Sequence, residues 1–140
     1  MRGVYTLILK LSKSKWLRIG KLGRFHFKKG YYVYTGSAMG KSSQSLGGRI
    51  SRHISTNKTL RWHIDYLIAD EDVKIVGFIT WKTDKSLECM INKKIKDECK
   101  GIVLVPNFGS KDCKAGCGSH LLYLGENLPI EIIKYQINLK

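Results

Sequence analysis

Residues 31–37, YYVYTGS, carry the clearest structural pattern in the chain. Aromatic and β-branched side chains alternate here with a period of two, which is typical of a β-strand. The alternation places Tyr32 and Tyr34 on one face of that strand. Because Lys28-Lys29-Gly30 predicts a turn just before it, we expect residues 16–27 and 31–37 to form a hairpin or meander.

Further strands and helices are predicted around this one. Residues 2–10, RGVYTLILK, alternate with apolar side chains on both faces, which predicts a strand buried on both sides. Other strands are expected over residues 73–81, 101–106 and 119–124. Apolar residues three or four apart predict helices over residues 44–54, 60–69 and 85–97, and Pro129 begins a last helix. The expected fold is α/β of the α+β type, with a small, mostly antiparallel central sheet flanked by helices.

Two of these helices carry specific expectations. Thr83 and Asp84 are side chains that cap helices, so we expect them to begin the helix over residues 85–97. The last helix is expected to cover the sheet with Ile130, Ile133 and Ile137.

Length and composition limit what the protein can be. A chain of 140 residues suits one packed domain, so we expect residues 1–140 to form a single domain. No apolar run approaches the roughly 20 residues of a membrane-spanning helix, no signal peptide precedes the first predicted strand, and the four cysteines are too few and irregularly spaced for a secreted disulfide framework. We therefore expect a cytoplasmic monomer with no membrane contact.

The charge points to a polyanionic partner. Lys and Arg number 25 against 11 Asp and Glu, which gives a net charge of +14. So large a charge costs self-repulsion in the folded state, and binding to nucleic acid would offset that cost. The alternative is a solvated surface rich in lysine, so the charge alone does not decide.

Four short motifs become informative when they are read together. They are Gly3-Val4-Tyr5, Tyr34-Thr35-Gly36, the pair Arg49 and His53, and Glu88. Their order and spacing resemble the GIY-YIG endonuclease superfamily, in which two tripeptides lie on neighbouring strands, an Arg and a His follow on the next helix, and a Glu comes on a later helix. The strings YVYTGSA, RWHIDYL, SLECMI, FGSKDC and SHLLYL are similar to one branch of that superfamily, sometimes fused to endonuclease III.

The resemblance implies a metal-dependent endonuclease that hydrolyses DNA phosphodiester bonds, in DNA repair or recombination. Carried over to this chain, it implies Tyr5, Tyr34, Arg49 and His53 as catalytic residues and Glu88 as the ligand of Mg²⁺ or Mn²⁺. The DNA would be selected by structure rather than by sequence, and association with a repair enzyme is a further expectation.

The chemistry of phosphodiester hydrolysis needs residues of these types. A water must be deprotonated, and the charge on the phosphoryl oxygens must be neutralised. Tyr5 and Tyr34 could orient or deprotonate the water if nearby positive charge lowers a phenol pKa. Arg49 would stabilise the phosphate bidentately and Glu88 would offer Mg²⁺ a hard oxygen, while His53 could assist proton transfer.

Each residue also has a structural explanation. The tyrosines could pack across the sheet, Arg49 and His53 could form a solvated basic helix face, and Glu88 could complement a helix dipole. His63 is either a second catalytic histidine or a core histidine bonded to backbone, and Trp62 is more simply a packing residue than a base-stacking platform. These explanations remain open for each residue taken singly.

The remaining candidates concern contacts and metals. The side chains expected to contact nucleic acid are Arg52, Arg61, Lys41, Ser110 and His120. The last site residue is left among Asn107, Ser110, Asp112 and His120. A zinc site of Cys99, Cys113, Cys117 and His120 is less favoured than a Cys113–Cys117 disulfide or buried thiols, because the spacing is not that of a zinc finger.

Two rivals to the endonuclease hypothesis remain. One is a nucleic-acid-binding module that shares the fold and basic face and does not cleave. The other is a protein-interaction domain that partners a repair enzyme. Arg49 and Glu88 together favour the nuclease, because a scaffold has no need of both.

Overall fold

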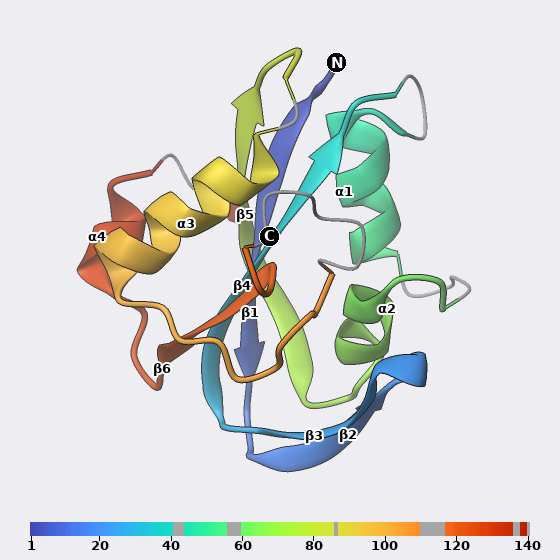
Figure 1. Cartoon of the computed structure of the whole chain (residues 1–140), viewed down its shortest axis with the longest axis vertical. Coiled ribbons are helices and arrows are strands. Elements are labelled where there is room, and N and C mark those ends of the chain that lie inside the picture. Colours follow the sequence, from blue (N-terminus) through green and yellow to red (C-terminus); the bar gives the residue numbers. More distant parts are fainter. Residues whose placement is uncertain (41–43, 56–59, 86, 110–116, 136–137, 140) are drawn as a thin grey trace.

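The structure is a computed structural model, and it describes residues 1–40, 44–55, 60–85, 87–109, 117–135 and 138–139. Among these residues, five strands form one sheet in the order β6-β4-β1-β5-β7, with every neighbouring pair antiparallel (Figure 1). The strands are β1 (Gly3–Leu11), β4 (Gly30–Ala38), β5 (Val73–Lys82), β6 (Leu121–Gly125) and β7 (Asn138–Leu139). The predicted α+β fold with an antiparallel central sheet is confirmed.

A two-stranded hairpin stands between β1 and β4 in the chain. It consists of β2 (Lys15–Ile19), a 3-10 turn η1 (Gly20–Leu22) and β3 (Gly23–Phe27). Lys15 joins the hairpin to the turn before β5, since its Nζ lies 2.9 Å from Asp70 and 2.7 Å from Asp72. Together these hydrogen bonds raise the pKa of Lys15 to about 12, and the one to Asp72 contributes most.

The helices cover both faces of the sheet (Figure 1). On one face α1 (Leu46–Ile54) and α2 (His63–Ile68) pack with the hairpin against the side of β1 and β4 that carries Tyr5, Tyr32 and Tyr34. On the other face α3 (Glu88–Cys99) and α4 (Ile130–Ile133) pack against the opposite side chains of the same strands. Strand β1 is therefore buried on both faces, as its alternation predicted.

The ends of several elements differ from the prediction. Helix α3 begins at Glu88, three residues later than expected, because β5 continues to Lys82 and Thr83 accepts a hydrogen bond from the Lys85 N–H in a turn. The cap predicted at Thr83 and Asp84 was thus wrong. Only Ile102 of the strand predicted over residues 101–106 pairs with a neighbour, in an isolated bridge to Tyr123.

The last helix buries a different side chain from those expected. Ile132 is fully buried, whereas Ile130 is 71% exposed and Ile133 60% exposed. Those two were wrongly expected to cover the sheet, because α4 has only four residues and turns one side chain inward. Ile137 lies outside the described residues.

Within the described part of the chain, no helix is both long enough and apolar enough to span a membrane.

Candidate active site

A pocket of about 660 Å³ lies beside the start of β1 and the end of β4. Elements from both faces of the sheet reach it, since it receives side chains from α1, α2 and the first residue of α3. The residues singled out from the sequence that line it are Tyr5, Tyr34, Arg49, Arg61, His63, Glu88 and His120. Segments up to 115 residues apart in sequence therefore meet at one hollow, which is the first requirement of an active site.

The two tyrosines of the site lie on one face because of the register of β1 and β4. Tyr5 pairs with Gly36 and Leu7 with Tyr34, so the two phenol rings are diagonal neighbours whose centroids are 6.5 Å apart. The Tyr5 ring leans across Gly36: a Cβ at position 36 would lie 2.6 Å from the Tyr5 hydroxyl oxygen. The glycine of the Tyr34-Thr35-Gly36 motif thus makes room for the Tyr5 phenol.

His53 lies behind Tyr5 rather than in solvent. It is fully buried on α1, and its Nε2 is 2.8 Å from the Tyr5 hydroxyl. Its ring also contacts Tyr34 and Trp62. The suggestion that Arg49 and His53 form a solvated helix face is therefore wrong for His53, and the histidine is placed to exchange a proton with Tyr5.

The phenols do not have the lowered pKa on which direct deprotonation of the water by a tyrosine would depend. Burial raises the pKa of Tyr5 well above its usual value, and Tyr34 adds to this, while the Arg49 guanidinium lowers it by less. Burial likewise raises the pKa of Tyr34, with a further contribution from Glu88. That condition is not met because desolvation outweighs the nearby positive charge, so both phenols stay protonated at neutral pH.

Arg49 projects from α1 beside an indole. Its Cζ lies 4.6 Å from the centroid of the Trp62 ring, a distance typical of a cation–π contact. Arg61 approaches the same ring at 6.0 Å. Trp62 is partly buried against the core, as a packing residue would be, and it also lines the pocket. The indole thus helps to orient the guanidinium that the pocket presents.

Arg52 also lies over the Trp62 ring, with its Cζ 4.1 Å from the centroid, and it binds a carboxylate as well. Its two terminal nitrogens donate to the two carboxylate oxygens of Asp65 at 2.8 and 2.9 Å. The backbone N–H groups of Arg61 and Trp62 donate to the same carboxylate, which closes the first turn of α2. Burial acts to raise the pKa of Asp65, but these donors outweigh it and the pKa is lowered. Arg52, expected to contact nucleic acid, thus joins α1 to α2 and does not line the pocket.

His63 combines features of both hypotheses made for it. Its Nδ1 accepts a hydrogen bond of 2.8 Å from the backbone N–H of Gly109, and its ring packs against Phe108. It also lines the pocket. Because Nδ1 is the acceptor, the neutral ring carries its proton on Nε2. Asp65, two residues away, is engaged by Arg52 and the start of α2, because residues two apart do not share a helix face.

Glu88 reaches the pocket as the first residue of α3. Its negative charge contributes to the raised pKa of both Tyr5 and Tyr34. The carboxylate is the acidic side chain that the described lining contains, and it is the hard oxygen donor that Mg²⁺ prefers. The carboxylate therefore lines the same pocket as Tyr5 and Arg49, as the proposed chemistry requires.

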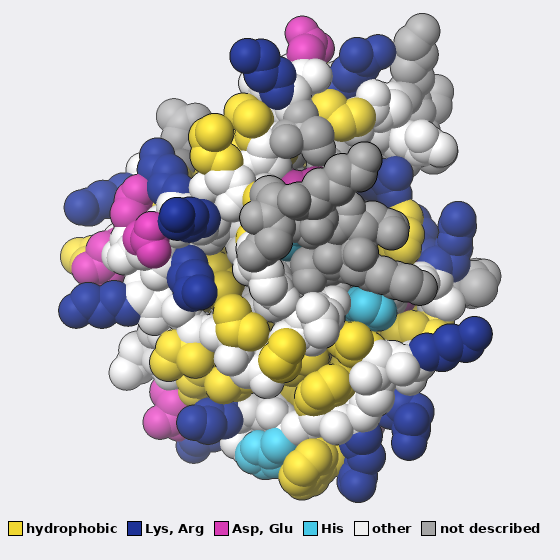
Figure 2. Space-filling view, in the orientation of Figure 1, with side chains coloured by type: hydrophobic (Ala, Val, Ile, Leu, Met, Phe, Trp, Pro, Cys, Tyr) yellow, Lys and Arg dark blue, Asp and Glu magenta, His cyan; other side chains and the backbone are white. Residues whose placement is uncertain are grey.

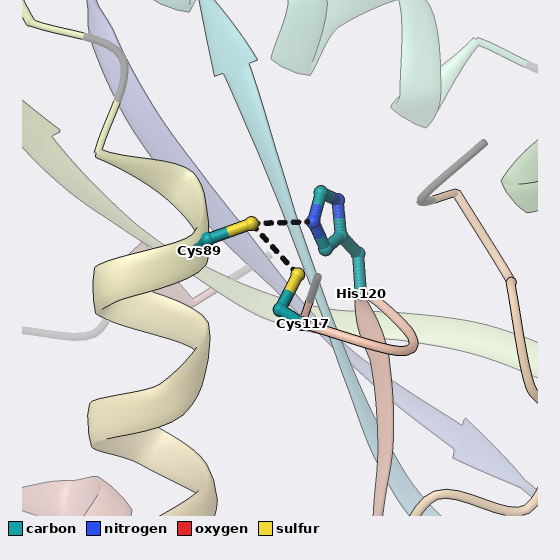
Figure 3. A group of neighbouring side chains, drawn as sticks. All are labelled: Cys89, Cys117 and His120. Carbon is teal, nitrogen blue, oxygen red and sulfur yellow. Dashed lines mark hydrogen bonds between the residues drawn. The ribbon is translucent and has the colours of Figure 1, made fainter. Parts of the chain in front are cut away.

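A second group of side chains lies next to Glu88. Cys89 Sγ is 2.7 Å from Cys117 Sγ and 3.3 Å from His120 Nε2, and the three ligand atoms all lie within 4.8 Å of one another (Figure 3). This cluster could hold a metal ion. The sequence reasoning included Cys117 and His120 but missed Cys89, and it included Cys99, which is buried at the other end of α3 in the core.

Some predicted residues are not placed at the pocket. Lys41, Ser110, Asp112 and Cys113 lie outside the described residues. Asn107 adopts a left-handed conformation and its backbone N–H donates to Gly118, but it does not line the pocket, whereas His120 does.

Among the lining residues that were not expected, Lys21 and Tyr66 have long side chains. Lys21 comes from the turn between β2 and β3, and nothing local in the sequence marks it. Tyr66 lies one helical turn after His63, so the spacing of three residues on α2 could have identified it.

Comparison with known proteins gives one match. The model of a family described as a domain of unknown function, DUF123, matches residues 4–138. No curated protein and no solved structure matches the chain.

Proposed function

Because the chain belongs to the DUF123 family, described as a domain of unknown function, we propose its activity from its own residues: it is a metal-dependent endonuclease that hydrolyses DNA phosphodiester bonds. The observation that carries the proposal is the convergence of a phenol backed by an imidazole, a guanidinium and a carboxylate on one pocket. These groups supply a proton acceptor, a phosphate ligand and a metal ligand. The resemblance of the same residues to GIY-YIG nucleases supports the same reaction.

Tyr5 and His53 are assigned to the attacking water. A phenol with a raised pKa is a poor base by itself, but Tyr5 is hydrogen-bonded to His53. Tyr5 can take a proton from the water as it passes its own proton to His53 Nε2, so that no phenolate accumulates. The water oxygen forms the new bond to phosphorus as the bond to the leaving oxygen breaks.

Arg49 is assigned to the phosphate under attack. Its guanidinium lies in the pocket wall beside Trp62, and it can offer two parallel N–H donors to the phosphoryl oxygens. Tyr34 lines the same pocket, with its ring centroid 6.5 Å from that of Tyr5, and can help to orient the water. His63, whose neutral ring carries its proton on Nε2, can donate a hydrogen bond to the leaving oxygen, and solvent water supplies the proton that this oxygen takes up once the bond has broken.

Glu88 is the residue that would hold the divalent ion. One carboxylate suffices for Mg²⁺, which keeps most of its own waters in such sites. When bound, the ion would neutralise charge on the phosphoryl and leaving oxygens. Mn²⁺ prefers the same oxygen ligands and would substitute for it.

The charge distribution supports DNA as the polyanion. Lys21 and Arg61 line the pocket with Arg49, and Figure 2 shows further Lys and Arg side chains around the margin of one face. Contacts of this kind reach phosphates and carry no base information. We therefore propose a nuclease that selects DNA by structure, in repair or recombination.

The test is cleavage of supercoiled, flapped and branched DNA with and without Mg²⁺ or Mn²⁺. The wild type is expected to nick at least one of these, and Glu88→Gln is expected to lose at least about 100-fold in rate while its DNA affinity stays the same or rises. Glu71→Gln, a change at an exposed glutamate in the turn before β5, is the matched control and should behave as wild type.

Two results would contradict the proposal. If no metal and no DNA structure supports cleavage while DNA still binds, the protein is a binding module. If Glu88→Gln cleaves as fast as Glu71→Gln, the carboxylate is not the metal ligand.

A further inference from the structure

We propose that Cys89, Cys117 and His120 form a binding site for Zn²⁺ that ties α3 to the segment leading into β6. This site is distinct from the Mg²⁺ site assigned to Glu88, and it stands whether or not the protein cleaves DNA. Its ligands come from the first turn of α3 and from a segment 28 residues further along the chain (Figure 3).

The distances are close to those a zinc ion requires. Zinc bonds to sulfur at about 2.3 Å and to imidazole nitrogen at about 2.0–2.1 Å, so ligands on a tetrahedral ion lie roughly 3.5–3.8 Å from one another. Cys89 Sγ is already 3.3 Å from His120 Nε2, and it is 2.7 Å from Cys117 Sγ. Separating the two sulfur atoms by about 1 Å, through rotation of the cysteine side chains, would create the geometry.

The backbone that carries the ligands is already held in place. Asn92, one turn after Cys89 on α3, donates from Nδ2 to the Ser119 carbonyl at 2.8 Å and is itself buried. The His120 N–H donates to Phe108, and the His120 carbonyl accepts from the Thr35 N–H of β4. The segment that contains two of the ligands is therefore fixed against both α3 and β4 before any ion binds, which lowers the ordering cost of binding.

The donor set selects for zinc rather than magnesium. Thiolate and imidazole are the ligands of Zn²⁺ sites, while Mg²⁺ takes carboxylate, carbonyl and water oxygens. Zinc binding would release the thiol protons, and the cation would then offset the repulsion between the neighbouring thiolates. Glu88 and Cys89 are consecutive, so an ion on Cys89 would hold the first turn of α3, and with it the Glu88 carboxylate, at the pocket.

A disulfide between Cys89 and Cys117 is the rival explanation. It would join the two sulfur atoms but would not bond to the buried imidazole of His120, which lies 3.3 Å from Cys89 Sγ. The presence of the third ligand atom within 4.8 Å of both sulfur atoms therefore favours the metal.

The experiment measures metal content directly. Protein purified without chelators should contain about one zinc per chain, as measured by inductively coupled plasma mass spectrometry. Replacement of the zinc by Co²⁺ should produce the thiolate-to-cobalt charge-transfer absorption that reports sulfur ligands. Cys89→Ser and Cys117→Ser should lose the zinc and the absorption. Cys99→Ala, at a buried cysteine in the same helix, is the matched control and should retain both.

Variants are compared only after circular dichroism shows that they are folded, and a second readout uses the wild type alone. Alkylation with peptide mapping should label Cys89 and Cys117 only after a chelator is added. Wild-type protein that binds no zinc, a Cys89–Cys117 disulfide that persists in that protein, or zinc retained by Cys89→Ser would each overturn the proposal.

Discussion

Tyr5 belongs both to the core and to the candidate site. Its ring packs against Tyr34 and His53 and the residue is 3% exposed, yet it lines the pocket and its hydroxyl is hydrogen-bonded to the His53 imidazole. Burial keeps the phenol protonated, so its usefulness depends on the histidine behind it. A residue with this environment is fitted to pass a proton rather than to hold a negative charge.

Removal of that hydroxyl tests the assignment. Tyr5→Phe should lower the cleavage rate by at least about 100-fold, because general base assistance is worth that much, while DNA affinity is unchanged. Tyr31→Phe is the control, since Tyr31 lies on β4 but packs with the core on the opposite face of the sheet. Rates under single-turnover conditions make the comparison, and equal rates for the two variants would remove Tyr5 from the mechanism.

Helices α1 and α2 are joined by one buried ion pair. Asp65 is fully buried and accepts hydrogen bonds from the Arg52 guanidinium and from two backbone N–H groups. The two helices carry Arg49, His53 and His63, so the pair holds the relative position of three candidate catalytic side chains. We therefore expect a structural change here to affect both stability and activity.

Asp65→Asn should lower the free energy of unfolding by about 2–4 kcal/mol at pH 7, because Arg52 loses its charged partner. The folded-state pKa of Asp65 is lowered, so its contribution is complete above the unfolded-state pKa of about 3.9 and is lost as the pH falls below it. Urea denaturation at several pH values should show the gap between wild type and variant narrowing in acid. A gap that does not change with pH would contradict this account.

Two glycines in neighbouring elements should respond in opposite ways to alanine. Gly36→Ala places a Cβ 2.6 Å from the Tyr5 hydroxyl oxygen, so the ring must move and we expect a loss of about 1–3 kcal/mol. Gly47→Ala, in α1, meets nothing within 4 Å and should gain about 0.5 kcal/mol from lower backbone entropy of the unfolded chain. Thermal denaturation of both variants measures these changes in stability. If Gly36→Ala is as stable as the wild type, the close approach of the Tyr5 ring to Gly36 is not needed for folding.

Patterns of period two predicted the elements better than they predicted their ends. Alternation in residues 2–10 and 31–37 is a local property of the chain, and both strands are where it indicated. The start of α3 was predicted too early because a threonine side chain that accepts a backbone hydrogen bond can either cap a helix or close a turn. Thr83 closes a turn. Where α4 turns its side chains depends on contacts with α3 and the sheet, which no local pattern contains.

At the scale of the whole molecule, the candidate site is an assembly of distant segments. The order of the motifs along the chain suggested that Tyr5, Arg49 and Glu88 belong together, and the structure places them around one pocket. The Cys89 cluster could not be found in this way, because its spacing matches no common metal motif and its geometry depends on how α3 crosses the sheet. The raised pKa of the phenols also depends on burial, which sequence does not quantify.

The charge of the whole chain makes a prediction about salt. If the protein contacts four phosphates, its DNA affinity should fall roughly 100-fold between 50 and 200 mM salt, because each contact releases counterions. Arg61→Ala should remove one phosphate contact and so reduce by about one the slope of the logarithm of affinity against the logarithm of salt concentration. Lys74→Ala, at an exposed residue of β5 away from the pocket, should leave that slope unchanged. Fluorescence anisotropy over a salt series measures both, and an affinity independent of salt would argue against any nucleic-acid partner.

We propose that this pocket holds a DNA phosphate between Arg49 and an ion on Glu88. Crystals of the Tyr5→Phe variant with a short DNA duplex and Mn²⁺ would test it, since the anomalous scattering of Mn²⁺ locates the ion independently of the protein. We predict an anomalous peak beside the Glu88 carboxylate, with a phosphate within hydrogen-bond reach of Arg49. DNA bound on a face away from the pocket, with no ion beside Glu88, would rule out this arrangement.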